Sequence, residues 1–266
     1  MGGTLAKYAS AGVKVYYACA TRGEVGTIDA KYMVGYTEPG DCRWDELTCA
    51  SKELGLSGVI HLGYRDSGMP GSPDNQHPQA LAAAPLQEVT GRVVKVLREL
   101  RPEVVVTFDP IGGYRHPDHI AIHLATVAAF QAAADPARFT KHGPAYQPQK
   151  LYYAVFSRGF LKLAVRLLPL FGRNPRAFGR NGDIDLVSLA EVEYPPTVLI
   201  AVRGEAARRR DAASACHQSQ LSEGQNGRGI LGFVAKLLQN RDGFMRVQPP
   251  IVPGGPRERD LFEGVR

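Results

Sequence analysis

The sequence is poor in cysteine and has no long apolar run. Its 266 residues include only four cysteines, with no C-x-x-C pair among them: Cys19, Cys42, Cys49 and Cys216. So few cysteines in a chain of this length do not indicate a disulfide scaffold. No signal peptide precedes the first predicted element, and no run of about 18 apolar residues could span a bilayer. We therefore expect a cytoplasmic protein whose cysteines are reduced.

The sequence also lacks a phosphate-binding loop, and one of its segments lacks acidic residues. Neither G-x-G-x-x-G nor a Walker A motif is present, which disfavours a nucleotide-binding protein. Residues 158–180 contain no Asp or Glu and carry six cations: Arg158, Lys162, Arg166, Arg173, Arg176 and Arg180. This excess equals the formal net charge of +6. The rest of the chain is balanced, so no nucleic-acid-binding domain is predicted.

The basic segment at 158–180 admits three interpretations. Phe160–Leu168 is apolar with cations at i and i+4, a pattern found in helices that lie on anionic membrane surfaces. Its arginines could instead meet an anionic substrate group such as a phosphate. We favour the third interpretation, in which the helix packs over the sheet edge or the cleft with its cations pointing outward.

Apolar runs typical of strands alternate with segments of helical periodicity. Strands are predicted at 13–20, 59–63, 104–109, 151–156 and 198–202, and helices at 43–54, 85–100 and 117–134. This alternation indicates βαβ units, and 44% hydrophobic residues allow one sizeable core. We predict the α/β fold class: a Rossmann-like three-layer sandwich with a mostly parallel sheet. A single domain would span 1–266, with a Rossmann-like core at 1–135 and a C-terminal part at 136–266.

The two ends of the chain depart from this pattern. Residues 1–9 are predicted to be helical and are followed by Gly12, whereas a doubly wound fold usually opens with a central strand. We therefore expect the first strand of the fold to be missing. The tail after Gly243 is rich in proline, with Pro249, Pro250, Pro253 and Pro256. We expect this tail to be extended and partly disordered.

The densest chemistry lies in G-G-Y-R-H-P-D-H at Gly112–His119, directly after the strand predicted at 104–109. Parallel strands open at their carboxyl ends into the crevice where α/β folds bind ligands. The proline suits the first turn of a helix. His116 therefore lies at the N-terminal end of this helix, and His119 lies one turn further along it. The two imidazoles suit the metal site of a zinc hydrolase. Asp118 can orient the ring of His116, and the hydroxyl of Tyr114 can donate a hydrogen bond to a developing oxyanion. We disfavour a purely structural role in helix capping and core packing.

Six segments of the chain form an ordered set of motifs. They are G-G-T-L-A at Gly2–Ala6, T-R-G-E at Thr21–Glu24, R-x-x-E-L at Arg43–Leu47, Y-R-D-S-G-M at Tyr64–Met69, the motif at Gly112–His119 and C-H-Q-S-Q at Cys216–Gln220. This set resembles the LmbE/PIG-L superfamily of zinc-dependent N-deacetylases, well from about Gly2 to Phe130 and sparsely afterwards. The resemblance implies an LmbE-like domain and a metal-dependent hydrolase of linear amides, which removes an acetyl group from an N-acetylglucosamine-type conjugate.

The resemblance also implies a role for each matching side chain. His119 would bind the metal, Zn²⁺ or Fe²⁺, while His116, oriented by Asp118, would act as general acid or electrostatic stabiliser. Tyr114 would polarise the amide carbonyl. Three further residues would hold sugar hydroxyls or a charged aglycone: Glu24, Arg43 and Asp66. His217 is the best candidate for a further cleft residue. The partner would be a small-molecule amino-sugar conjugate, and a homo-oligomer is compatible with the sequence.

One motif of the superfamily has no counterpart here. The resemblance implies A-H-P-D-D-E shortly before G-G-T, with a second His ligand, an Asp ligand and the Asp general base. Met1 is instead followed at once by Gly2. We therefore expect a start inside a longer protein, weak zinc binding and no hydrolysis by these 266 residues, with both restored by an upstream H-P-D-D strand. The alternative is an inactive sugar-binding module. A metal site formed by His116, His119 and His123 on one helix is disfavoured.

Overall fold

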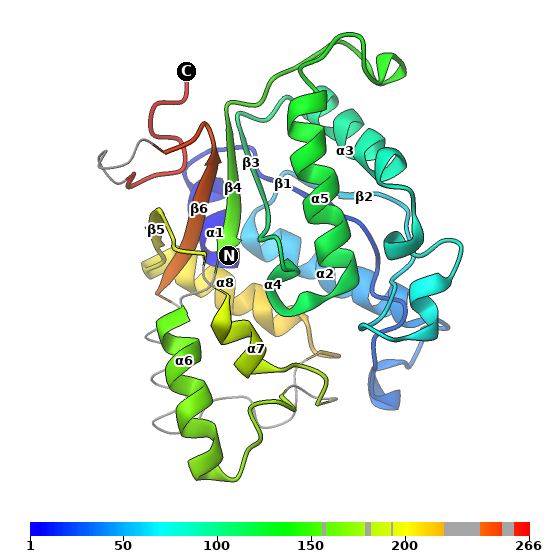
Figure 1. Cartoon of the computed structure of the whole chain (residues 1–266), viewed down its shortest axis with the longest axis vertical. Helices are drawn as coiled ribbons and strands as arrows, with labels where there is room; N and C mark the ends of the chain where they lie inside the picture. Colours follow the sequence, from blue (N-terminus) through cyan, green and yellow to red (C-terminus); the bar gives the residue numbers. More distant parts are fainter. Residues whose placement is uncertain (156–157, 179–181, 193, 221–239, 252–257) are drawn as a thin grey trace.

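Two sheets form the middle layer of the molecule (Figure 1). The computed structural model describes residues 1–155, 158–178, 182–192, 194–220, 240–251 and 258–266. The first sheet pairs β1 (Tyr16–Cys19) with β2 (Gly58–His61) in parallel. The second has the order β3-β4-β6-β5. In it, β3 (Val104–Phe108) and β4 (Lys150–Val155) are parallel, and β6 (Arg241–Gln248) is antiparallel to both β4 and β5 (Val198–Ala201).

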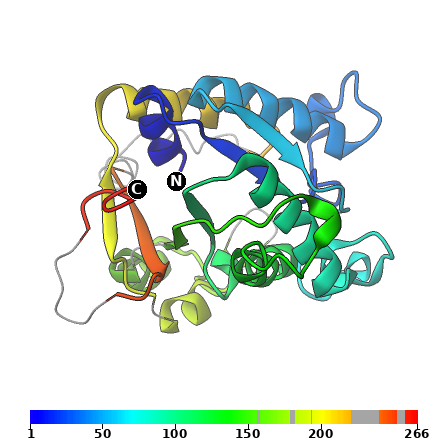
Figure 2. The same ribbon diagram turned by 90° about the horizontal axis from the view of Figure 1, so that it is seen from above.

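Helices cover both faces of the sheets (Figure 2). One layer holds α1 (Gly2–Ser10), α2 (Pro39–Leu54) and α8 (Gly204–Cys216), which share an apolar core. The opposite layer holds α3 (Leu86–Leu100) and α5 (Pro117–Ala132), which pack on each other. Within the described ranges, three further α-helices are α4 (Gly112–Arg115), α6 (Arg158–Leu167) and α7 (Leu186–Glu191). The predicted three-layer α/β fold class is confirmed.

The residues of β4 show how strand alternation separates the two layers. Leu151 and Tyr153 pack with Phe130 of α5. Tyr152, between them in sequence, packs with Tyr8 of α1. Because successive side chains of a strand point to opposite faces, this short apolar run contributes to a core on each side of the sheet.

The two sheets are separated, since β1 and β3 do not pair with each other in the part of the chain that the structure describes. A cavity of about 340 Å³ lies between them, with Tyr17, Val106 and Ile122 in its largely apolar lining. The lining also includes Asp118 and His119, which follow the carboxyl end of β3. The cavity between the sheets therefore reaches the residues for which chemistry is predicted.

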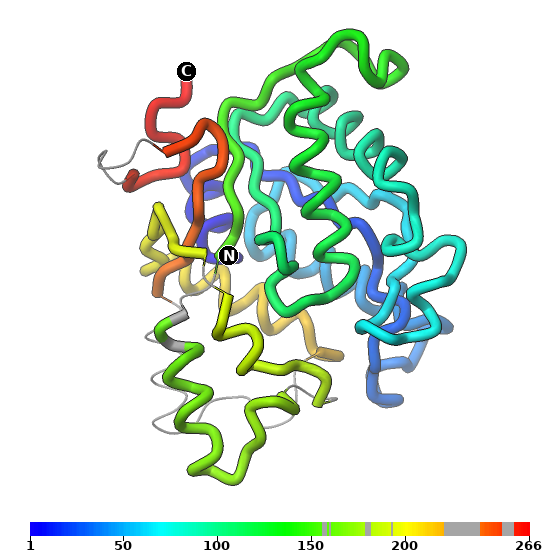
Figure 3. The backbone as a smooth tube through the Cα atoms, in the orientation of Figure 1, coloured from blue at the N-terminus to red at the C-terminus, as the bar shows by residue number. Residues whose placement is uncertain are grey.

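The C-terminal part corrects one expectation. The tail after Gly243 was expected to be extended and partly disordered, yet Arg241–Gln248 forms β6, the strand between β4 and β5. Its mixed polar sequence gives little period-two signal, and its place depends on ladder bonds to strands far away in sequence. Residues 258–266 return beside α1 (Figure 3), where the Leu261 amide donates to the hydroxyl of Tyr8 at 2.9 Å. Pro253 and Pro256 lie outside the described residues.

The basic segment forms α6 and a short 3-10 turn at Leu168–Phe171. The helix packs mainly against α7. Its cations Lys162 and Arg166 are exposed, as predicted, but Leu163 and Leu167 are also exposed beside them. Residues 179–181 lie outside the described part. Among the helices that the structure describes, none combines the length and apolar character needed to cross a membrane.

The expectation that all cysteines are reduced is wrong for two of them. Cys49 of α2 and Cys216, the last residue of α8, form a disulfide across 167 residues of sequence. Cys19 and Cys42 are free. No local spacing could indicate the pair, because it depends on the packing of α8 against α2.

Candidate active site

A tight turn at Gly112 brings the end of β3 against α5. Gly112 has φ +63°, and a Cβ there would lie 2.7 Å from the Cβ of His119. Glycine is therefore required both for its backbone conformation and for the close approach. The carboxylate of the fully buried Asp109 accepts a hydrogen bond from the amide of Gly113 at 2.8 Å and so stabilises the turn. Arg115 also has a positive φ of 69°. Such backbone strain is concentrated at functional sites.

His119 is held as a neutral imidazole beside this turn. Its Nδ1–H donates to the carbonyl oxygen of Gly112 at 3.0 Å. The ring stacks on Phe108, with 3.9 Å between ring centroids, and meets the ring of Tyr114 edge-on at 5.0 Å. Burial and then the neighbouring His116 lower the pKa of His119 to about 4. The Nδ1 hydrogen bond directs Nε2 to any metal, as in most metal-binding histidines.

Three further ligand-type side chains converge next to His119. One ligand atom each from Asp66, His116 and Asp118 lies within 4.8 Å of the others. The Nε2 of His116 is 3.8 Å from the Oδ1 of Asp66, and the rings of His116 and His119 are 5.0 Å apart. Imidazole and carboxylate donors at this spacing match the ligand chemistry of zinc and of ferrous iron. The residues present therefore fit a divalent cation.

Asp118 is buried and tied to the Asp66 loop. Its carboxylate accepts the Ser67 amide at 3.0 Å and also the Ser67 hydroxyl. Burial raises the pKa of Asp118 to about 7, although the hydrogen bonds from Ser67 act in the opposite direction. Ser67 was not among the predicted site residues, although it lies within the Y-R-D-S-G-M motif and could have been predicted from it.

His116 serves as the N-cap of α5. Its Nδ1 accepts the amide of Asp118 at 3.2 Å, whereas the Asp118 carboxylate lies 4.0 Å from the same nitrogen. That distance is too long for a hydrogen bond, so the backbone rather than the carboxylate of Asp118 orients the ring. Burial lowers the pKa of His116, while the charge of Asp66 raises it. The Nε2 atom is the one directed towards Asp66 and the rest of the site.

Tyr114 covers the two imidazoles from the solvent side. It is 36% exposed, and its ring lies edge-on to His116 at 5.9 Å. Burial and the charge of Asp66 raise the pKa of Tyr114, so its hydroxyl remains a hydrogen-bond donor at neutral pH.

Glu24 and Arg43 form the wall next to Asp66. The Glu24 carboxylate accepts the amide of Asp66 at 2.9 Å and the amide of Arg22 at 3.3 Å, so Glu24 fixes the position of the Asp66 loop. The guanidinium of Arg43 packs on Gly23 and Gly26, where a Cβ would lie within 2.4 Å of it. The buried Nε of Arg43 has no hydrogen-bond partner in the part of the chain that is described.

The chain is similar to known proteins of one family. Residues 1–130 match the family described as PIG-L: GlcNAc-PI de-N-acetylase. The chain is 35% identical over 277 residues to the 1D-myo-inositol 2-acetamido-2-deoxy-alpha-D-glucopyranoside deacetylase of Rhodococcus erythropolis, with 99% of this chain and 92% of the relative covered. It is 38% identical over 274 residues to deacetylase 1 of the same name from Catenulispora acidiphila, with 99% and 84% covered.

Two solved structures share the fold. The N,N'-diacetylchitobiose deacetylase from Pyrococcus horikoshii has a TM-score of 0.62 at 19% identity and covers 96% of this chain and 81% of its own. The zinc-inhibited form of teicoplanin deacetylase Orf2 has a TM-score of 0.53 at 18% identity, with 94% of both chains covered. At these identities the likeness concerns the fold.

Proposed function

Because the chain belongs to the PIG-L family, as its curated relatives establish, we propose that it is a metal-dependent hydrolase. Its substrate would be an N-acetylglucosamine-type conjugate, from which it removes the acetyl group as acetate. The observation that carries this proposal is the convergence of Asp66, His116 and Asp118 beside His119 at the carboxyl end of β3. Side chains suited to metal binding and to proton transfer are therefore neighbours in this site.

We propose that His119 and the carboxylates beside it hold Zn²⁺ or Fe²⁺. The bound cation would supply Lewis acidity and would lower the pKa of a water molecule. The protein would keep His119 neutral through burial and through the Gly112 hydrogen bond. It would fix Asp118 through Ser67, so that little rearrangement accompanies metal binding. A preorganised ligand set of this kind raises metal affinity.

His116 and Tyr114 would perform the proton transfer and the charge stabilisation. His116 would take up the proton that the attacking water gives up and would deliver a proton to the amine that leaves as the amide C–N bond breaks. The hydroxyl of Tyr114 would donate a hydrogen bond to the amide oxygen as negative charge develops on it. Both groups stand over the same imidazole, His119, so they can act on one bound acetamide.

Substrate binding would involve Arg43, whereas Asp66, predicted as a substrate ligand, would lie with the metal-binding groups. Arg43 is half-buried on Gly23 and Gly26, and its guanidinium would hold a sugar hydroxyl or a charged aglycone. Glu24, predicted as a direct sugar ligand, would instead act by holding the Asp66 loop in place.

The alternative to the hydrolase is a sugar-binding module without hydrolysis. One experiment separates the two. The chain is assayed for bound metal, for sugar binding and for acetate release from an N-acetylglucosaminyl-inositol, with and without an added amino-terminal strand that carries H-P-D-D. Acetate release by either form that is lost on His119→Ala supports the hydrolase. Sugar binding with no acetate from either form supports the module.

A further inference from the structure

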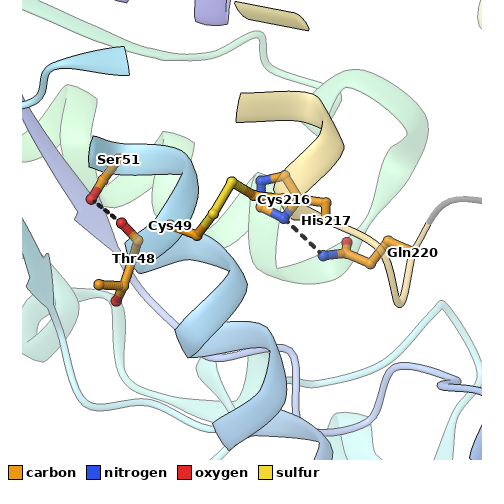
Figure 4. The surroundings of a disulfide bond; sticks show 6 residues. All are labelled: Thr48, Cys49, Ser51, Cys216, His217 and Gln220. Carbon is orange, nitrogen blue, oxygen red and sulfur yellow. Dashed lines mark hydrogen bonds between the residues drawn. A yellow bond between two sulfur atoms is a disulfide. The ribbon is translucent and has the colours of Figure 1, made fainter. Parts of the chain in front are cut away.

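The Cys49–Cys216 disulfide joins α2 to the end of α8 (Figure 4). Cys49 is exposed on α2, and Cys216 is half-buried at the end of α8. A disulfide with an accessible sulfur is open to attack by an external thiolate, whereas a buried one is protected. The bond also sits directly before His217, the histidine that matches the late superfamily motif.

A second contact holds the chain after Cys216 against α2. The buried carboxylate of Glu46 accepts the Ser219 amide at 2.6 Å and the Ser219 hydroxyl at 2.8 Å. The side-chain amide of Gln220 is 3.3 Å from the Nδ1 of His217 (Figure 4). Glu46 and Cys49 are three residues apart on one helix, so the segment 217–220 is fastened to the same face of α2 at two points.

α2 also carries Arg43, which connects this segment to the active site. Burial lowers the pKa of His217, the Glu46 carboxylate raises it and the charge of Arg43 lowers it. The charge of Arg43 also lowers the pKa of His116, after larger effects of burial and of nearby carboxylates. The Arg43 guanidinium packs on Gly23 and Gly26, next to Glu24, which holds the Asp66 loop. Because Arg43 and Glu46 are three residues apart on α2, the Glu46–Ser219 contact fastens segment 217–220 about one helical turn from this wall.

We propose that the Cys49–Cys216 disulfide is a redox modification site that positions His217 at the rim of the substrate cleft. The proposal rests on the proposed function, because His217 would act on the amino-sugar conjugate. A dithiol reductant would transfer two electrons and two protons to the bond. The S–S bond breaks, Cys49 and Cys216 become thiols, and the dithiol closes to its own disulfide. His217 would then be held only through the Glu46–Ser219 contact.

Reduction of the purified full chain with dithiothreitol tests this. Thiols are labelled after denaturation, with and without prior reduction, so that mass spectrometry separates the thiols released by reduction from the free Cys19 and Cys42. We expect two of them, faster amide hydrogen exchange at 217–220, and a rise of about fivefold in KM with little change in kcat. The rise follows because the apparent affinity falls with the fraction of molecules in which His217 is in place.

Two variants complete the design. The double variant Cys49→Ser with Cys216→Ser should have the KM and the amide exchange of the reduced protein, and dithiothreitol should change neither. His217→Ala should raise KM by a similar factor in the oxidised state, and reduction should add nothing further, because both changes remove one interaction.

Two results would overturn the proposal: unchanged exchange at 217–220 after complete reduction, or additive effects of reduction and His217→Ala on KM. If no form releases acetate, the proposed function fails. In that case, amide exchange at 217–220 and sugar affinity before and after reduction still test whether the disulfide positions His217.

Discussion

Two buried polar clusters lie at opposite ends of the β3–β4 pair, and their charges are balanced differently. The two strands are parallel, with Val104 opposite Lys150 and Phe108 opposite Ala154. At the carboxyl end of β3 lies the site cluster: Asp66, His116, Asp118 and His119. At the amino end of β4 lies the anchor cluster: Lys150, Tyr152, Arg246 and Glu258.

In the anchor cluster each buried charge meets an opposite one. Lys150, only 5% exposed, donates to Glu258 at 2.6 Å and to the carbonyl of Glu263. Glu258 also accepts the hydroxyl of Tyr152 at 2.9 Å and the guanidinium of Arg246. Burial alone would raise the pKa of Glu258, but the hydrogen bonds from Lys150 and Tyr152 lower it below the ordinary value. The anchor cluster thus stabilises the ionised carboxylate.

In the site cluster the ionised forms are disfavoured instead. Burial raises the pKa of Asp118 to about 7 and lowers that of His119 to about 4. Both groups therefore favour their neutral forms, and a divalent cation would reverse this preference for the carboxylate. Displaced pKa values beside incomplete compensation are common at functional sites. Both clusters are buried, yet the carboxyl pKa is raised for Asp118 and lowered for Glu258, so the partners of a buried carboxylate, and not burial alone, decide its charge.

The largest effect is expected at the site cluster, from His116→Asn. Asparagine can still cap α5, so stability should change by less than about 1 kcal/mol. Loss of the proton donor should lower kcat by about 10²–10⁴-fold. Acetate-release kinetics of the form with the added H-P-D-D strand, beside thermal unfolding of the same preparation, measure both quantities. A variant with near-normal kcat would remove His116 from the reaction.

Glu258→Ala should lower the stability of the protein and leave kcat unchanged. It leaves Lys150 and Arg246 with an uncompensated buried charge, and removal of one partner from such a pair costs about 3–5 kcal/mol. The kcat of the folded fraction should be unchanged because the cluster lies at the far end of the strands. Denaturant unfolding with Glu258→Gln as the matched control measures the loss. A loss below about 1 kcal/mol would show that the network contributes little.

The sequence allowed more of the site cluster than of the anchor cluster to be predicted. His116, Asp118 and His119 stand in one motif at a strand end, where local pattern and chemistry coincide. Asp66 was placed at the cleft by motif resemblance, and the structure brings it to 3.8 Å from His116. The role of Glu24 as a loop support was not predicted, because it depends on a backbone amide 42 residues away.

The anchor cluster has no such local signal. Glu258 and Lys150 are 108 residues apart, and β6, which carries Arg246, was assigned to a disordered tail. The Cys49–Cys216 bond escaped prediction for the same reason. The five predicted strands were found because their apolar runs are local. Contacts that join distant segments depend on the assembled fold, and no spacing in the sequence encodes them.

Asp118→Asn should change how the stability of the metal-free protein depends on pH. The folded-state pKa of Asp118 is raised from 3.8 to about 7, so its contribution to stability falls as the pH rises from about 4 to 7. His119, with its pKa lowered from 6.5 to about 4, contributes the opposite slope over that range. The variant loses the Asp118 slope, so it should gain about 4 kcal/mol relative to the wild type between these pH values.

Urea unfolding at several pH values, with chelator present, measures this difference. Asp74→Asn provides a matched control, since Asp74 is partly exposed in a pair with Arg65. Parallel pH curves for the wild type and Asp118→Asn would mean that Asp118 is ionised in the metal-free fold, contrary to the distinction drawn between the two clusters.

The smallest effect is expected from Tyr152→Phe in the anchor cluster. The ring of Tyr152 is fully buried, and phenylalanine keeps its packing while removing only the hydroxyl that donates to Glu258. One such hydrogen bond contributes about 1 kcal/mol, and Lys150 still compensates the carboxylate, so the loss should be about that size. The folded-state pKa of Glu258 should rise, which moves acid unfolding to higher pH because its stabilisation is lost as pH falls through that pKa. Unfolding free energies at pH 7 and pH 4 test both points, and a loss near that of Glu258→Ala would mean that the hydroxyl, rather than the charges, holds the anchor cluster together.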